Sequence, residues 1–277
     1  MAPASAKPGG RMRKNGAVQT SELADAVDHS FVDAWRRLAG REQGFQARFG
    51  VVEVAATGAP VAAFNPIFVL RELENAGDLA QAVTALQRVG LPFVVYMRAD
   101  LGDATTSAVS DLQLHQGGLM PGMAMPLPVG APPSPPALRF TRVADPRSYE
   151  DFIAIGAEGF EIPVDLLGDL LPPAIFDDPD ARAYVAYVDT EPVATSVGIQ
   201  VGGVLGIYNV ATPPTRRRAG YGTAVTWQAI ADADPETTSV VLQSSDMGIG
   251  VYERMGFRRV VEYLEFESPS GTDGPDR

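Results

Sequence analysis

Residues 209–230 read NVATPPTRRRAGYGTAVTWQAI, a strand end, a turn and a helix start in immediate succession. The apolar run breaks at Pro213 and Pro214 into three arginines and a Gly-x-Gly turn, and a helix-forming segment follows. Glycines let a ligand approach the backbone closely, and the first-turn N–H groups of a helix have no intrahelical partner. The helix dipole and the arginines both favour negative charge at this point. The stretch therefore predicts a binding site for a pyrophosphate.

Composition narrows the classes of partner. The chain has 277 residues and a formal net charge of −12, which argues against general binding to nucleic acid or to an anionic membrane. It contains no cysteine, which excludes disulfides and thiol catalysis. His29 and His115 lie far apart and form no metal-ligand pattern, so we expect no metal. With no apolar run near the ~20 residues that span a bilayer, and no secretion signal, we expect a cytoplasmic protein.

A proline-rich segment separates two halves of the chain. Residues 126–136 read PLPVGAPPSPP, and six prolines in eleven residues cannot continue a helix or a central strand. Both ends of the chain have compositions typical of disorder. The expected parts are a disordered arm (1–20), an N-terminal domain (21–125), a linker (126–137), a C-terminal domain (138–267) and a disordered tail (268–277).

The second half shows a clear order of elements. Helical spacing at 148–160 and 164–176 follows a first strand at 138–145, and three successive strands are predicted from 181 to 212. A helix, a buried strand, a short helix and a closing strand come next. The first half has a weaker version of this order, with helices predicted over 78–90 and 107–118 around a strand at 91–99. An internal structural duplication is therefore plausible.

At this point the second half resembles the GNAT family of acyl-CoA-dependent N-acetyltransferases. The family's acyl-CoA loop, Arg/Gln-x-x-Gly-x-Gly/Ala after a strand, is matched from Arg217 to Gly222, and VYERMGF at 251–257 fits its tyrosine-containing helix. Two such motifs about 30 residues apart, with a strand between them, are fairly specific. The resemblance implies an α/β fold with a mixed, mostly antiparallel sheet flanked by helices. It also suggests two tandem GNAT-like halves, the first of them degenerate.

The resemblance assigns acetyl-CoA as cosubstrate and places it at the turn. Backbone N–H groups would face the phosphates, two arginines could pair with phosphate oxygens, and the end of the preceding strand would pair with the pantetheine arm. The expected binding residues are Val210, Thr212, Arg217, Arg218, Ala219, Gly220, Tyr221, Gly222 and Thr223.

The resemblance also implies that Tyr252 is the general acid that protonates the departing thiolate. A phenol with a reference pKa of ~10 is a workable donor to a thiolate whose conjugate acid lies near ~8.5. The general base is open. Asp246, after the next strand, is one candidate, and Ser244 or Ser245 could orient a water. A substrate that arrives already deprotonated is a further alternative.

The first half lacks the arginines and the Gly-x-Gly turn. In their place lies RELENAG, residues 71–77, whose acidic side chains would repel a pyrophosphate. We therefore expect one acyl-CoA per chain, with the first half packing against the second and walling the acceptor cleft.

These expectations converge on an N-acetyltransferase that moves an acetyl group from acetyl-CoA to a primary amine in a ternary complex. The acceptor would be a small-molecule amine or a lysine side chain, and the acidic composition mildly favours a cationic one. The alternative is a non-catalytic acyl-CoA-binding sensor or partner module. A dinucleotide-binding oxidoreductase is disfavoured because its Gly-x-Gly-x-x-Gly fingerprint is incomplete and follows three consecutive strands rather than a first one.

Overall fold

One continuous sheet runs through both halves of the chain. The computed structural model describes residues 11–40, 43–127 and 137–268. Most of the expected linker, the outer part of the tail and residues 1–10 of the arm lie outside these ranges. Within the described residues eleven strands share one sheet, in the order β1-β2-β3-β4-β11-β5-β10-β9-β8-β7-β6. The strands are β1 (Phe45–Phe49), β2 (Val52–Ala56), β3 (Pro66–Val69), β4 (Val94–Arg98), β5 (His115–Pro126), β6 (Arg139–Arg142), β7 (Ala181–Val188), β8 (Glu191–Val201), β9 (Val204–Ala211), β10 (Ser239–Gln243) and β11 (Arg258–Glu267).

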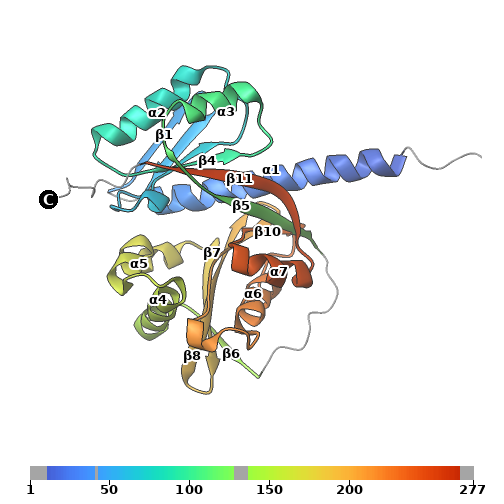
Figure 1. The fold of residues 1–277 in the computed structure, drawn as a ribbon. Coiled ribbons are helices and arrows are strands. Elements are labelled where there is room, and N and C mark those ends of the chain that lie inside the picture. Colours follow the sequence, from blue (N-terminus) through green and yellow to red (C-terminus); the bar gives the residue numbers. More distant parts are fainter. Residues whose placement is uncertain (1–10, 41–42, 128–136, 269–277) are drawn as a thin grey trace, which may run out of the picture.

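Helices cover the two faces of this sheet (Figure 1). The mixed, mostly antiparallel sheet flanked by helices is confirmed, because only the β3–β4 and β9–β10 pairs are parallel. The helices are α1 (Arg11–Ala39), α2 (Ala76–Arg88), α3 (Asp103–Ser110), α4 (Pro146–Phe160), α5 (Val164–Leu170), α6 (Tyr221–Ala231) and α7 (Asp246–Met255), with short 3₁₀ turns η1 (Ala62–Phe64), η2 (Pro173–Asp177) and η3 (Pro214–Arg216).

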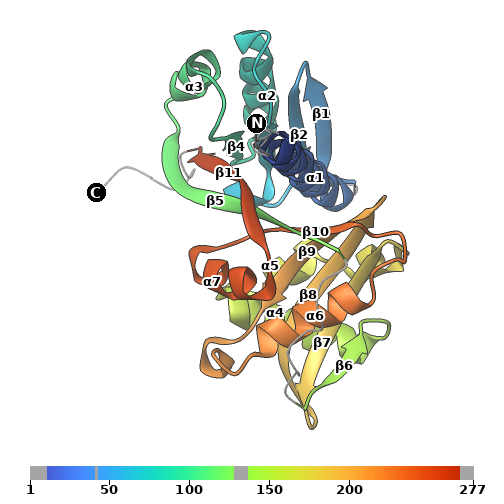
Figure 2. The same cartoon turned by 90° about the vertical axis from the view of Figure 1, so that its right-hand side faces the viewer.

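The long helix α1 lies across the middle of the sheet, between the two halves (Figure 2). Its buried side chains Val27 and Phe31 pack with Phe68 and Tyr263, which come from strands of different halves. On the opposite face of the second half, α6 and α7 pack over a separate core. The helix begins at Arg11, inside the stretch for which the sequence predicts a disordered arm.

The last strand of each half is paired with the other half. β5 pairs with β10 from Ser239↔Pro126 to Gln243↔Gly122, and β11 pairs with β4 from Tyr263↔Arg98 to Glu267↔Val94. β5 and β11 also pair with each other and cross between the halves in Figure 1. Each half therefore completes the sheet of the other.

The helix predicted over 107–118 is wrong in its second part. Helix α3 ends at Ser110, and β5 begins at His115. The segment is extended because it fills the space between β11 and β10, where a tertiary position overrides a weak local pattern. Gly122 is required at this crossing, since a Cβ there would lie 2.5 Å from Val261 Cγ1 and 2.8 Å from Val27 Cγ1.

Candidate active site

A wedge opens in the sheet between β9 and β10. The two parallel strands pair only at Val204↔Ser239, Leu205↔Val240 and Gly206↔Val241, after which they separate. Strand β9 then carries a bulge, because its register against β8 moves from Val197↔Tyr208 to Thr195↔Ala211. Asn209 within the bulge has a φ of 49°, in the left-handed region. Among the described residues, the backbone at this end of β9 therefore has no strand partner on the β10 side.

The Gly-x-Gly turn stands at the mouth of this wedge. Gly220 has a φ of 83° and immediately precedes α6, whose first intrahelical bond runs from Ala224 N to Gly220 O at 3.0 Å. Space around Gly220 is open, and a Cβ on Gly222 would come within 3.3 Å of Thr212 Oγ1. Among the described residues, no backbone carbonyl of a turn, loop or cap accepts a hydrogen bond from the N–H groups of residues 218–223. The turn therefore fits an anionic group held by backbone donors.

The two expected phosphate-binding arginines differ in their surroundings. Arg217 Nε donates to Thr212 O at 3.2 Å, and its NH2 donates to Gly159 O at 2.9 Å and to Glu161 Oε1 at 3.4 Å. Its guanidinium thus ties the turn to the end of β9 and to the loop after α4. Arg218 is exposed, with a φ of 68°. Of the pair, Arg218 is the one whose side chain extends into solvent beside the turn.

Tyr252 lies on α7 and faces the same space. Its ring packs edge-on against Phe257, with centroids 5.7 Å apart. Gly248, one helical turn earlier, leaves room for the ring, because a Cβ there would lie 3.0 Å from a Tyr252 ring carbon. Burial raises the pKa of Tyr252 to about 12. The phenol is therefore protonated at neutral pH and can donate a hydrogen bond.

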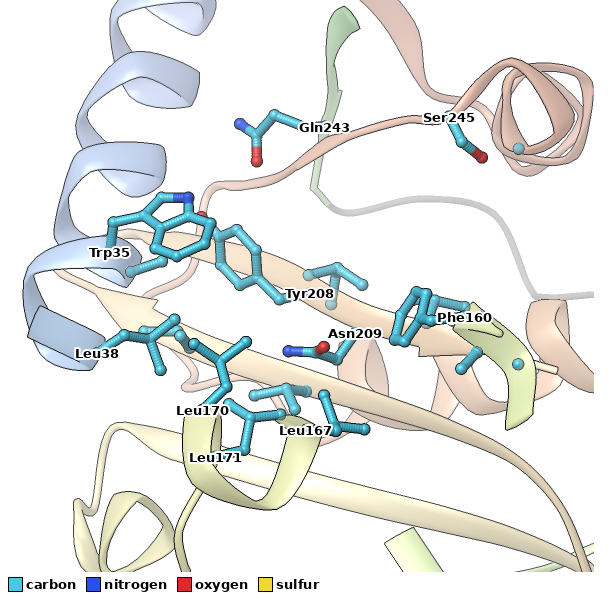
Figure 3. Close-up of a pocket in the computed structure, with 18 of the residues that line it drawn as sticks. Trp35, Leu38, Phe160, Leu167, Leu170, Leu171, Tyr208, Asn209, Gln243 and Ser245 are labelled. Atoms are coloured by element: carbon cyan, nitrogen blue, oxygen red, sulfur yellow. The ribbon is translucent and has the colours of Figure 1, made fainter. Parts of the chain in front are cut away.

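A cavity of about 920 Å³ joins these features. Val210, Thr212, Arg217, Gly222 and Tyr252 line the end of it beside the Gly-x-Gly turn. From there it extends to a chamber between α1 and α5, whose walls are mainly aliphatic and aromatic (Figure 3). The side chains of this chamber that Figure 3 labels are Trp35, Leu38, Phe160, Leu167, Leu170, Leu171, Tyr208, Asn209 and Gln243.

The second half of the chain contains a match to a known protein family. Residues 150–257 match the model of the Acetyltransferase (GNAT) family. These residues form a GNAT domain. Membership of this domain in an acetyltransferase family supports acyl transfer in general. Among curated proteins, none matches the chain.

Several solved structures are similar in fold to most of this chain. A GCN5-related N-acetyltransferase from Kribbella flavida is 17% identical, with a TM-score of 0.66 over 89% of this chain and 96% of that one. A tandem GNAT protein from the clavulanic acid biosynthesis pathway is 12% identical, with a TM-score of 0.52 over 82% and 79% of the two chains. A GCN5-related N-acetyltransferase from Sphaerobacter thermophilus is 15% identical, with a TM-score of 0.53 over 78% and 76%. Identities this low establish the common fold alone, and the tandem neighbour supports the two GNAT-like halves.

Asp246, the candidate general base, does not line the cavity. Asp246 is the first residue of α7, is exposed, and is not among the side chains that line the cavity. Ser244 is buried and its hydroxyl donates to Ser245 O at 2.8 Å, while Ser245 itself lines the cavity. Of the three, only Ser245 borders the cavity directly.

The carboxylates that do border the cavity of the GNAT domain are held by arginines. Glu161 lies 3.4 Å from the guanidinium of Arg217. Asp178 pairs with Arg37, which also binds Asp33 at 2.7 Å. Within the described residues, the cavity wall therefore offers no carboxylate without a cationic partner. No group of three or more potential metal ligands occurs in that part of the chain, nor a helix long and apolar enough to cross a membrane.

Sequence reasoning missed two polar residues of the cavity. Glu161 follows α4 at a φ of 59°, and its role comes from an arginine 56 residues later, which no local pattern shows. Gln243 ends the buried strand β10, and its Nε2 is buried without a hydrogen-bond partner among the described residues. A polar residue at the end of the apolar run SVVLQ was the available signal for Gln243.

Proposed function

We propose that this chain is an N-acetyltransferase that transfers an acetyl group from acetyl-CoA to a primary amine, with both substrates bound at once. The observation that carries the proposal is the continuity of one cavity. It runs from Arg217 and Gly222 of the glycine turn, along the end of β9, past Tyr252 and into the chamber. Such a shape holds a donor and an acceptor with their reacting atoms adjacent, which is the proximity that direct transfer requires.

The residues of the turn would hold the pyrophosphate of acetyl-CoA. The unpaired N–H groups from Arg218 to Thr223 would donate to phosphate oxygens, and the Arg218 guanidinium would add charge. Arg217 would contribute mainly by fixing the turn against Thr212 O and Gly159 O. Val210 and Thr212 would pair with the amides of the pantetheine arm in the manner of an added strand.

The high pKa of Tyr252 limits how it can act. A phenol at about 12 lies ~3.5 units above a thiol near ~8.5, so a complete proton transfer to the thiolate would be uphill by roughly 5 kcal/mol. We therefore propose that Tyr252 donates a hydrogen bond to the sulfur as the C–S bond breaks. The amine nitrogen forms the new C–N bond, and the proton that nitrogen loses ends on sulfur, passed through the phenol or through water. Charge and protons then balance, leaving an amide and free thiol.

A base is needed only if the amine arrives as an ammonium ion. Asp246 would have to reach the amine through water, since it does not line the cavity. Ser245 could hold that water at the cavity wall. An acceptor that binds in its neutral form would need neither residue.

The test is thiol release from acetyl-CoA across a panel of amines, with the Tyr252→Phe variant alongside. We expect turnover with at least one amine, a loss of kcat of about 10²-fold or more in the variant, and little change in CoA affinity. Tyr149→Phe is the matched control, since it removes a phenol from α4 outside the cavity lining. Tight CoA binding with no turnover, and no effect of Tyr252→Phe, would instead establish an acyl-CoA-binding sensor.

A further inference from the structure

A hydrogen bond joins helix α1 of the first half to strand β9 of the GNAT domain. Ser30 Oγ and the hydroxyl oxygen of Tyr208 lie 2.7 Å apart, although 178 residues separate them in the chain. Figure 3 shows the Tyr208 ring directed from β9 toward α1. Gly206 makes room for the pair, because a Cβ there would lie 2.4 Å from Ser30 Oγ and 2.5 Å from a Tyr208 ring carbon. The packing of the two halves is therefore shaped around this bond.

Helix α1 is firmly attached to the sheet beside Ser30. The buried carboxylate of Asp28 accepts a hydrogen bond from the Tyr263 hydroxyl at 2.6 Å and one from Arg98 NH1 at 3.1 Å. These partners lie on β11 and β4, in the middle of the sheet. Ser30 follows Asp28 by two residues and is itself buried. Its hydroxyl is therefore a fixed point against which a side chain of β9 can be held.

Tyr208 immediately precedes the bulge of β9. It pairs with Val197, whereas the next pair joins residues 195 and 211, so two residues of β9 lie opposite one of β8. Asn209, the first of the two, has a φ of 49°. A left-handed residue other than glycine costs free energy and persists where its surroundings fix it. Thr195 Oγ1 holds the bulge on the β8 side by donating to Asn209 O at 3.2 Å, and the bond to Ser30 holds the residue before it.

The form of this bulge decides how the end of β9 faces the cavity. Val210 and Thr212, which follow the bulge, line the cavity and are the residues proposed to pair with the pantetheine arm. Without the extra residue the register would shift by one, and each following side chain would turn to the other face of the sheet. The backbone groups that await the arm would then point elsewhere. Binding of the arm therefore requires the bulged form of β9.

We propose that Ser30 is a positioning residue for the cofactor, which acts through Tyr208 to hold the bulge of β9 in the form that pairs with the pantetheine arm of acetyl-CoA. Ser30 itself is not among the residues that line the cavity, so it acts without touching the cofactor. The first half of the chain thereby controls the cofactor site of the second. This inference rests on the proposed binding of acetyl-CoA, but it does not require that the acetyl group is transferred.

Calorimetry on the full chain with two probes, acetyl-CoA and ADP, tests the inference. ADP carries a pyrophosphate without a pantetheine arm, so it reports on the Gly-x-Gly turn alone. We expect Ser30→Ala and Tyr208→Phe each to weaken acetyl-CoA binding by about 2- to 10-fold and to leave ADP binding unchanged, because one lost hydrogen bond lowers the population of the competent bulge. The double variant should lose no more than the weaker-binding single variant, since both substitutions remove the same bond.

Matched variants separate positioning from a general loss of stability. Tyr187→Phe also removes a hydrogen-bonded phenol, because the Tyr187 hydroxyl donates to Asp151 Oδ2 at 2.7 Å on β7, outside the cavity lining. Ser110→Ala makes the serine change on an exposed site of α3. Both controls should keep the parent ratio of acetyl-CoA to ADP affinity, even where Tyr187→Phe lowers the melting temperature.

Three results would overturn the inference. These are an unchanged affinity ratio in both Ser30→Ala and Tyr208→Phe, losses that add in the double variant, or an equal weakening of ADP, which would place the disturbance at the turn. Turnover of an amine with an unchanged ratio would leave the proposed transfer standing and refute the positioning role. A shifted ratio without thiol release would refute the proposed transfer while supporting the positioning role.

Discussion

Either half of the chain produced without the other should fail to fold, because each half completes the sheet of the other. Consider a fragment that begins at residue 138 and keeps the whole GNAT domain. It loses β5 from β10 at five residue pairs and from β11 at eight. It also loses β4 from β11 at five residue pairs. The fragment keeps the Gly-x-Gly turn but loses both neighbours of its final strand, β11.

The stabilising free energy that the fragment loses can be estimated from the number of lost residue pairs between strands. At about one backbone hydrogen bond per residue pair and a net ~1 kcal/mol each, the missing pairs are worth on the order of 15–20 kcal/mol. Whole domains are stable by only ~5–15 kcal/mol. Removing α1 also exposes Val241 and Tyr263, which are 0% accessible in the intact chain. The fragment is therefore predicted not to fold as a monomer.

Circular dichroism, size-exclusion chromatography and thermal melting of three proteins would check this prediction. The intact chain should melt in one transition, and residues 138–277 alone should lack a cooperative melt or self-associate through the exposed edges. As a control, residues 1–132 and 133–277 produced together should assemble, since only a bond in the proline-rich segment is cut. A monomeric 138–277 fragment that melts cooperatively and binds CoA like the intact chain would refute the reasoning.

Three further predictions concern the cofactor end. Gly220→Ala should lower the free energy of unfolding by about 1–2 kcal/mol in urea and weaken CoA binding, because φ is 83° there; unchanged values would contradict the turn geometry. Since burial holds the pKa of Tyr252 at about 12, the neutral phenol's contribution to stability is present below pH ~10 and is lost as pH rises toward 12. A pH–kcat profile should accordingly show no ionisation of Tyr252 below pH ~10, and an alkaline limb near pH 9 that disappears in Tyr252→Phe would oppose it. Calorimetry should find one CoA per chain, against two if both halves bind.

The parts of the fold that the sequence predicts are those determined by residues close together along the chain. Pro213 and Pro214 end β9, Gly220 supplies a left-handed residue before α6, and Gly256 with a φ of 106° ends α7. Each signal needs only neighbours a few residues away, so a single chain is enough to read it.

The parts that the sequence does not predict depend on distant pairing. Residues 115–126 contain three glycines and two prolines, yet they form a strand because β11 and β10 border them. The tie of Arg217 to Gly159 spans 58 residues, and the hydroxyl of Tyr263 bonds Asp28 across 235. The chamber has the same origin, since Trp35 and Leu170 belong to different halves. The hydrophobic periodicity of the sequence does not indicate such long-range contacts.

The contrast between the two parallel strand pairs explains why one half alone should hold acetyl-CoA. In the second half, β9 and β10 separate after three paired residues and leave a wedge. In the first half, β3 and β4 stay paired from Pro66↔Val94 to Val69↔Met97, along all of β3. The start of α2 is also closed, because the Asn75 side chain accepts from Gly77 N at 3.0 Å, where a phosphate would otherwise bind. Among the described residues of the first half, β3 and β4 leave no unpaired backbone between them for a pantetheine arm to join, so the acidic loop that the sequence shows is one of three obstacles. The first half instead contributes α1 to the chamber, so the exchange of strands between the halves and the proposed acceptor site result from the same packing.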